Sequence, residues 1–137
     1  MPELLKNLLQ EDDKLLHKEL SYKVIGLAMK VHRELGGGFL ERVYENALAV
    51  LLRKESLNFD QQYPLKVYFE NEIVGEYVAD IILDRKIIIE LKVAESITSI
   101  HKAQAINYLK ATKLQLAIIL NFGKQSLQHE RVVNFQK

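Results

Sequence analysis

Apolar residues recur at helical spacing over the first part of the chain. Residues 1 to about 18 carry leucines interleaved with charged residues, which predicts an amphipathic helix. Ser21 can cap a second helix, whose apolar stripe continues to Leu35 and is followed by three consecutive glycines that can end it. A third helix is predicted from Leu40 to Leu51, where the apolar spacing is again helical.

The pattern then changes to that of strands. Residues 63–69 alternate between apolar and polar positions, and residues 78–83 and 86–93 are runs rich in β-branched side chains. The polar pair Asp84-Arg85 separates these two runs. We therefore expect an antiparallel meander of three strands, and the isoleucines beside the break predict strands covered on both faces.

A helix and further strands are predicted for the last third. Thr98 or Ser99 can cap a helix that ends near Thr112. Its apolar residues are expected to face the sheet (Ile100, Ala103 and Ile106). Residues 116–120 predict a buried strand parallel to the strand at 86–93, because a crossover helix lies between them, and residues 131–135 are expected to add a short strand. The fold class expected is a mixed α/β (α+β) domain with a central sheet flanked by helices.

Three charged residues interrupt the two central apolar runs: Asp80, Glu90 and Lys92. A buried carboxylate costs several kcal/mol unless it is paired, so this group calls for a cation, a substrate or a structural partner. A two-residue turn would place Asp80 and Glu90 on opposite faces of the sheet. A three-residue turn at 84–86 places residue 80 opposite residue 90, and all three charges then share one face.

We favour the second register, or a β-bulge that achieves the same alignment. Directly opposite residues have Cβ atoms roughly 4.5–5.5 Å apart, close enough for two carboxylates to hold one metal ion. The alternative is a salt-bridged group inside the sheet, but buried ion pairs are poor stabilisers.

Two other sets of polar residues are candidates. His101, Gln104 and Tyr108 follow one another at steps of three and four, so they share a stripe of the predicted helix, although a solvated surface is the alternative. Glu41 lies in the first turn of the third helix, where the helix dipole by itself favours an acid.

Composition limits the function classes. With 137 residues, 48% apolar and 27% charged, the chain suits one soluble domain. It has no cysteine, no apolar run near the roughly 20 residues that span a bilayer, and no signal-like start, so we expect a cytoplasmic protein without a membrane partner. We expect residues 1–19 to form a helical extension and residues 20–137 a single domain.

The net charge of +1 is unevenly distributed. Residues 70–95 carry seven acids against three bases, whereas residues 101–137 carry six Lys or Arg against one acid. This distribution fits a metal site beside a polyanion-binding surface, and it also fits ordinary solvated faces.

A family resemblance rests on these residues. Asp80 followed by Glu90-Leu91-Lys92 resembles the bipartite motif of the PD-(D/E)XK nuclease superfamily, with Ala79 where the proline of that name would stand. Residues 38–44, Gly-Phe-Leu-Glu-Arg-Val-Tyr, match the signature of the GxxExxY family in that superfamily. The resemblance covers about residues 20–135 and implies a core of α-β-β-β-α-β order.

The resemblance also implies a site. Asp80, Glu90 and the Leu91 carbonyl would bind Mg²⁺ or Mn²⁺, with Glu41 as a further ligand, and Lys92 would act on the attacking water. The remaining residues implied are Gln104 in a catalytic role and a substrate-binding set of Tyr108, His101, Lys102 and Tyr44. The implied activity is metal-dependent hydrolysis of phosphodiester bonds in nucleic acid, expected to be DNA.

Alternatives remain open. The chain could be a nucleic-acid-binding or assembly module that keeps the nuclease fold without turnover, or a hydrolase or metal-binding protein with a non-nucleic substrate. The leucine-rich N-terminal helix is a candidate homodimer surface.

Overall fold

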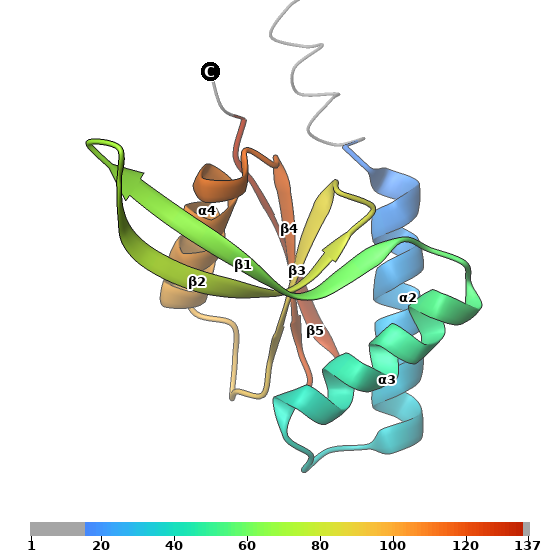
Figure 1. Cartoon of the computed structure of the whole chain (residues 1–137). Helices are drawn as coiled ribbons and strands as arrows, with labels where there is room; N and C mark the ends of the chain where they lie inside the picture. The colour runs from blue at the N-terminus through green and yellow to red at the C-terminus, as the bar shows by residue number, and fades with distance from the viewer. Residues whose placement is uncertain (1–15, 136–137) are drawn as a thin grey trace, which may run out of the picture.

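The computed structural model describes residues 16–135, which form three helices and one five-stranded mixed sheet (Figure 1). Neighbouring strands are antiparallel except for the parallel pair β3 and β4, and the strand order is β1-β2-β3-β4-β5. The predicted mixed sheet and three-strand meander are confirmed. The elements are α2 (Lys18–Leu35), α3 (Glu41–Lys54), β1 (Phe59–Phe69), β2 (Glu72–Leu83), β3 (Ile87–Lys92), α4 (Ser99–Thr112), β4 (Leu116–Asn121) and β5 (Gln128–Val133).

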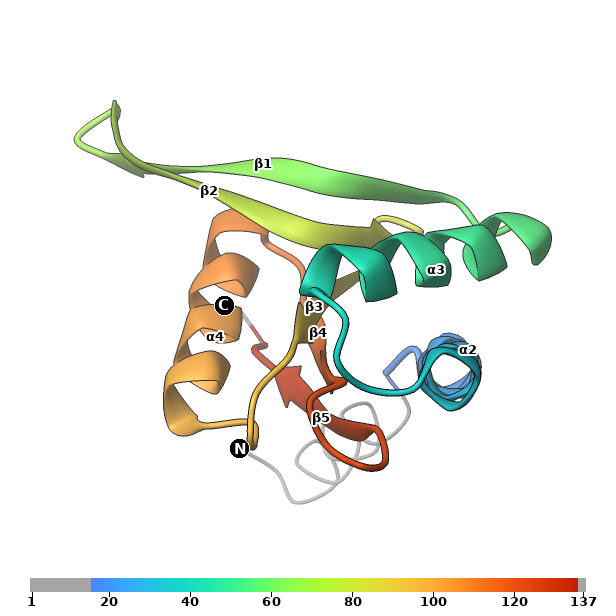
Figure 2. The same ribbon diagram turned by 90° about the horizontal axis from the view of Figure 1, so that it is seen from below.

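The sheet lies between two helical layers. Figure 2 shows α2 and α3 on one face and α4 on the other. Alternate residues of the central strands enter two separate apolar clusters: Ile81 and Ile89 pack toward α2 and α3, whereas Ile82 and Ile88 pack toward α4. In the paired stretch from Ile81 to Ile89, even-numbered residues therefore point toward α4, whereas earlier in β2 the odd-numbered Ala79 also packs in the α4-side cluster.

Helix α2 begins earlier than expected. It starts at Lys18, and Ser21 is a buried residue within the helix, so the predicted cap at Ser21 is wrong. Leu16 and Leu20 pack against the core on this side, and their burial favours a helix that begins before Ser21. The end at Leu35 is confirmed, with Gly36 at a positive φ of 72°, which favours glycine. Most of the predicted first helix, and with it the candidate dimer surface, lies outside the described residues.

Strands β1 and β5 differ from their predicted bounds. Phe59 packs against the core and pairs with Leu83, so β1 includes residues that the alternation after residue 63 does not reveal. Strand β5 begins at Gln128 rather than residue 131, because it pairs with the full length of β4. Its polar residues are tolerated because its partly exposed side chains line the edge of the sheet.

Helix α4 is rotated relative to the prediction. Ala105, Tyr108 and Leu109 are its buried residues, whereas Ile100 is 77% exposed. The expectation that Ile100, Ala103 and Ile106 would all face the sheet is wrong, although Ile106 is packed at the margin of the cluster. Apolar residues are spread around this helix, so its periodicity does not select a face. The start is as predicted: the Thr98 hydroxyl accepts the backbone N–H of His101.

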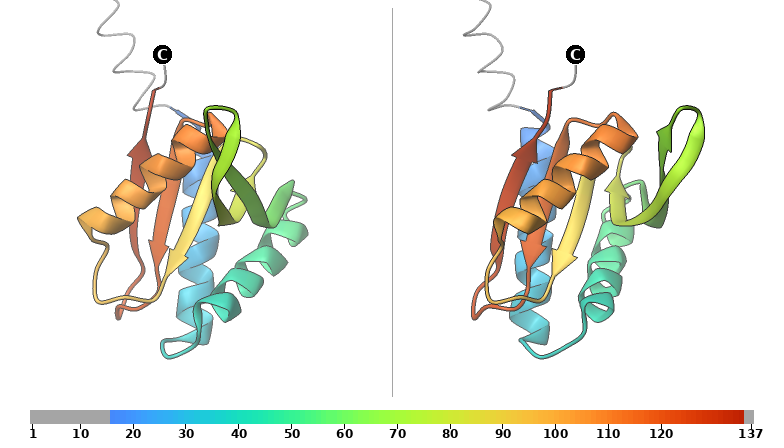
Figure 3. Two further views of the ribbon diagram at one scale, coloured as in Figure 1. Left: turned by 60° about the vertical axis from the view of Figure 1, so that its left-hand side comes forward. Right: turned by 90° about the vertical axis from the view of Figure 1, so that its left-hand side faces the viewer.

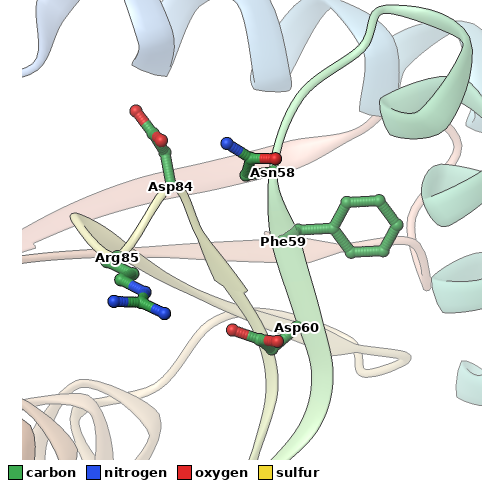
Figure 4. Close-up of a pocket in the computed structure, with 5 residues that line it drawn as sticks. All are labelled: Asn58, Phe59, Asp60, Asp84 and Arg85. Carbon is green, nitrogen blue, oxygen red and sulfur yellow. The ribbon is translucent and has the colours of Figure 1, made fainter.

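The turn between β2 and β3 sets the central register. Leu83 pairs with Ile87, which leaves the three-residue loop 84–86 and confirms the predicted register. Asp84 and Arg85 have φ values of 52° and 54°, as the two central residues of a type I′ turn require. The Asp84 N–H donates to the Asn58 carbonyl at 2.7 Å, and both residues lie around the pocket of about 420 Å³ in Figure 4.

No helix among residues 16–135 has the length and apolar character needed to cross a membrane.

Replacing Arg85 with glycine should stabilise the fold, because glycine adopts a positive φ without the steric cost that a Cβ atom brings. We expect Arg85→Gly to raise the free energy of unfolding by about 0.5–1 kcal/mol, measured by urea denaturation. Arg85→Ala is the matched control, since it removes the same charge but keeps Cβ. Equal effects of the two substitutions would contradict this explanation.

Candidate active site

Asp80 and Glu90 meet where β2 and β3 separate. The last paired residues of the ladder are Ile81 and Ile89, so the next opposed positions are 80 and 90. The Asp80 N–H donates to Glu90 Oε1 at 3.2 Å, and the Leu91 N–H donates to Asp80 Oδ2 at 2.9 Å. The two carboxylates thus replace the backbone partners that these N–H groups would otherwise find across the ladder.

The proximity of these carboxylates has an electrostatic consequence. Glu90 is only 5% exposed, and burial, followed by the negative charge of Asp80, raises its pKa to about 9. The hydrogen bond from the Asp80 backbone and the charge of Lys92 lower this pKa, but by less. Glu90 is therefore protonated at neutral pH unless a cation joins the pair.

Lys92 lies on the same face and is held from α4. Its Nζ donates to Gln104 Oε1 at 3.1 Å, and Gln104 Nε2 donates to the Tyr108 hydroxyl at 3.3 Å. Burial, then the charges of Glu90 and Asp80, raise the pKa of Tyr108 to about 12, so Tyr108 stays a neutral phenol. Two residues of the predicted stripe, Gln104 and Tyr108, thus lie at this site, and Gln104 contacts the lysine.

Residues that the sequence pattern does not single out connect to Asp80 from the other side. Glu45 on α3 is 2% exposed and accepts hydrogen bonds from the side-chain amides of Gln61 and Gln62, each at 2.7 Å. The Gln62 amide also lies 3.5 Å from Asp80 Oδ1. A buried acid on α3 is therefore linked to Asp80 through one amide group.

The Gln62 backbone explains how this link forms. Its φ is 53°, and the β1–β2 pairing passes from Gln61↔Ile81 to Tyr63↔Ala79 without pairing the residues between them. Positive φ is uncommon for a residue with a side chain, and in a strand it changes the direction in which that side chain points. The sequence gives one indication of this link: Glu45 is a charged residue beside the apolar stripe of the third predicted helix.

Other predicted residues lie outside this group. Glu41 is exposed at the start of α3, and Lys102 forms a 2.9 Å ion pair with Glu130. His101 Nδ1 accepts the Thr98 N–H at 3.1 Å as part of the helix cap. Tyr44 is fully buried, where its hydroxyl donates to the Gly36 carbonyl at 2.7 Å and its ring stacks on Phe122. The residues that the structure does bring together are Asp80, Glu90, Leu91, Lys92, Gln104 and Tyr108.

The donor set for a cation is small. Within residues 16–135, no group of three His, Asp or Glu side chains is close enough to hold a metal ion. The three-acid set that included Glu41 is therefore not assembled. Asp80 and Glu90 remain as two adjacent hard oxygen donors, and this chemistry fits Mg²⁺ or Mn²⁺, which commonly bind one or two carboxylates and keep several waters.

Comparison with known families identifies the fold. The model of the PD-(D/E)XK nuclease superfamily matches residues 18–132, which include Asp80, Glu90, Lys92 and Gln104. The chain belongs to the PD-(D/E)XK nuclease superfamily. The finer assignment to the GxxExxY family stays a prediction.

A solved structure shares this fold. The crystal structure of SSO0001 superposes with a TM-score of 0.55 at 16% sequence identity, covering 70% of this chain and 50% of that chain. The match thus spans half the length of SSO0001, and at this identity it shows the fold alone. No protein in the curated set matches the chain.

The end of β3 in this PD-(D/E)XK domain is fixed to β4. The Asn121 side chain is buried, accepts the N–H groups of Ala94 and Gly123, and donates to the Ala94 carbonyl. The Phe122 N–H donates to the Lys92 carbonyl at 2.8 Å. A Cβ atom at Gly123 would collide with the Ala94 backbone. This clamp positions the backbone that carries Lys92.

The raised pKa of Glu90 predicts how stability depends on pH without metal. Between the ordinary pKa of 4.5 and about 9, the folded state keeps a proton that the unfolded state releases. The free energy of unfolding should therefore fall as pH rises through this window. At pH 8, with a chelator present, we expect Glu90→Gln to be more stable than wild type by about 1–3 kcal/mol.

Urea denaturation at a series of pH values measures this effect. Glu72→Gln is the control, because Glu72 is an exposed acid at the start of β2. A Glu90→Gln profile that keeps the wild-type slope between pH 5 and 9 would show that Glu90 is not the titrating group.

Proposed function

We propose that this protein hydrolyses phosphodiester bonds in nucleic acid, expected to be DNA, with a divalent cation. One set of contacts carries the proposal: Asp80 and Glu90 lie together at the end of the ladder, the charge of Lys92 acts on Glu90, and Gln104 on α4 contacts the lysine. Membership in a nuclease superfamily supports the same reaction class.

Asp80 and Glu90, with the Leu91 carbonyl, are the proposed ligands of Mg²⁺ or Mn²⁺. When bound, the cation would polarise the phosphate and make a coordinated water more acidic. Glu90 would give up its proton on binding, because the positive charge reverses the effect that raises its pKa. Glu45 would orient Asp80 through the Gln62 amide.

Lys92 is the proposed partner of the attacking water. Its ammonium group, fixed by Gln104, would orient that water and offset the negative charge that develops on the phosphate oxygens. Tyr108 would keep the Gln104 amide in place as a hydrogen-bond acceptor. We assign Gln104 and Tyr108 as positioning residues.

Removal of a ligand or of the lysine should abolish cleavage. We expect Asp80→Asn and Lys92→Met to reduce hydrolysis of a labelled DNA substrate by at least about 100-fold in Mg²⁺ or Mn²⁺, and a chelator should stop the wild-type reaction. Gel electrophoresis of the products measures the rate. Lys30→Ala is the control, since Lys30 is an exposed lysine on α2, across the sheet from the site.

Two outcomes would overturn this assignment. Cleavage that persists in Asp80→Asn would place the chemistry elsewhere. Binding of nucleic acid without cleavage under any metal condition would favour a non-catalytic binding module that keeps the fold.

Gln104→Leu should lower kcat by roughly 10- to 100-fold with a smaller change in KM, because the lysine keeps its charge but loses its fixed position. Gln115→Leu is the matched control, because Gln115 is exposed just before β4. A change confined to KM would indicate that Gln104 contacts substrate instead of positioning Lys92.

A further inference from the structure

A groove of about 710 Å³ lies between the β1–β2 hairpin and α4. The hairpin extends away from the rest of the sheet beside this helix, as Figure 3 shows. A bulge between Val67 and Tyr68 interrupts the β1–β2 register in this part of the hairpin. The lining residues include three tyrosines and three lysines but no acid: Tyr68, Tyr77 and Tyr108 with Lys66, Lys110 and Lys113.

The aromatic side chains of this groove are open. Tyr68 is 61% exposed and Tyr77 is 50% exposed, whereas the Tyr108 ring lies deeper, 5.8 Å from that of Tyr77. Exposed aromatic rings and cationic side chains are the two elements from which single-strand binding grooves are built, because bases stack on the rings and phosphates approach the cations.

The groove also reaches the candidate active site. Gln104 and Tyr108 line it, and Gln104 contacts Lys92 directly. A chain lying in the groove would therefore pass beside the lysine and the Asp80–Glu90 pair. This continuity favours a polymer that is also the substrate over an unrelated protein partner.

We propose that this groove binds an unpaired strand of nucleic acid and guides it to the active site. The inference rests on the proposed nuclease function and specifies its substrate class. A single strand is favoured over a duplex because the faces of paired bases are already stacked on one another and are not available to Tyr68 and Tyr77. Lys66 and Lys110 supply the charge that attracts the phosphates.

Fluorescence anisotropy with labelled oligonucleotides tests the proposal on the full chain. In the presence of a chelator, oligo-dT, oligo-rU and a DNA duplex of equal length are compared, so that binding is measured without cleavage. The wild type should bind at least one single strand more tightly than the duplex, and the dT and rU arms show which sugar is preferred. Tyr68→Ala should weaken single-strand binding by roughly 5- to 100-fold.

A matched aromatic control is available on the opposite face of the sheet. Tyr22 on α2 is 69% exposed, so Tyr22→Ala removes an equally open ring without touching the groove and should leave binding unchanged. The double variant Lys66→Ala/Lys110→Ala should reduce the slope of log affinity against log salt by about 1.4, whereas Lys30→Ala/Lys54→Ala should not.

The outcomes separate this inference from the proposed function. Single-strand binding that depends on Tyr68 without any cleavage supports the groove and refutes the nuclease activity. Cleavage that is unaffected in Tyr68→Ala, with equal affinity for duplex and single strand, refutes the groove and leaves the nuclease in place. Self-association lost in Tyr68→Ala while nucleic-acid binding is unchanged would assign the groove to a second copy of the chain and overturn the proposal.

Discussion

The opposition of residues 80 and 90 is the constraint on which the site depends. It follows from the three-residue loop 84–86, because a loop one residue shorter would place residue 80 opposite residue 89 instead. The two carboxylates accept N–H groups at the point where the ladder ends, so they are part of the strand pairing as well as of the site. Fold and site therefore share one set of hydrogen bonds.

The buried pair of Asp80 and Glu90 lowers the stability of the fold locally, and the apolar strands around it compensate for this cost. Two acids a few ångströms apart in a poorly hydrated place resist joint ionisation, which the high pKa of Glu90 reflects. The isoleucine-rich strands around them bury apolar surface on both faces of the sheet. A strongly apolar sheet centre can thus carry a charged group that would unfold a weaker core.

Much of this could be predicted from the sequence, for identifiable reasons. The β-branched runs on either side of Asp84-Arg85 specify the hairpin, the loop length then sets residue 80 opposite residue 90, and the period of two puts Glu90 and Lys92 on one face. The four-residue step from Gln104 to Tyr108 predicts that the two share a stripe of the helix, and the structure shows a hydrogen bond between their side chains. These features depend on local geometry alone.

The remainder depends on tertiary packing. Glu45 reaches Asp80 only because Gln62 adopts a positive φ, and nothing in the residues around Gln62 announces that conformation. Tyr44 belongs to the same sequence motif as Glu41, yet it packs into the core, where its hydroxyl donates a hydrogen bond to the Gly36 carbonyl in the preceding loop. The rotation of α4 likewise follows from contacts with the sheet, since its apolar residues do not select a face.

Gly123 illustrates how far the site extends beyond its charged atoms. The close approach of its backbone to Ala94 keeps the outgoing ends of β3 and β4 in contact, two residues beyond Lys92. Even the smallest side chain at this position would come too close to the Ala94 backbone and force the two segments apart. Substitution of Gly123 by alanine therefore disturbs the region of the candidate site with every acidic and basic group intact, through the addition of one methyl group.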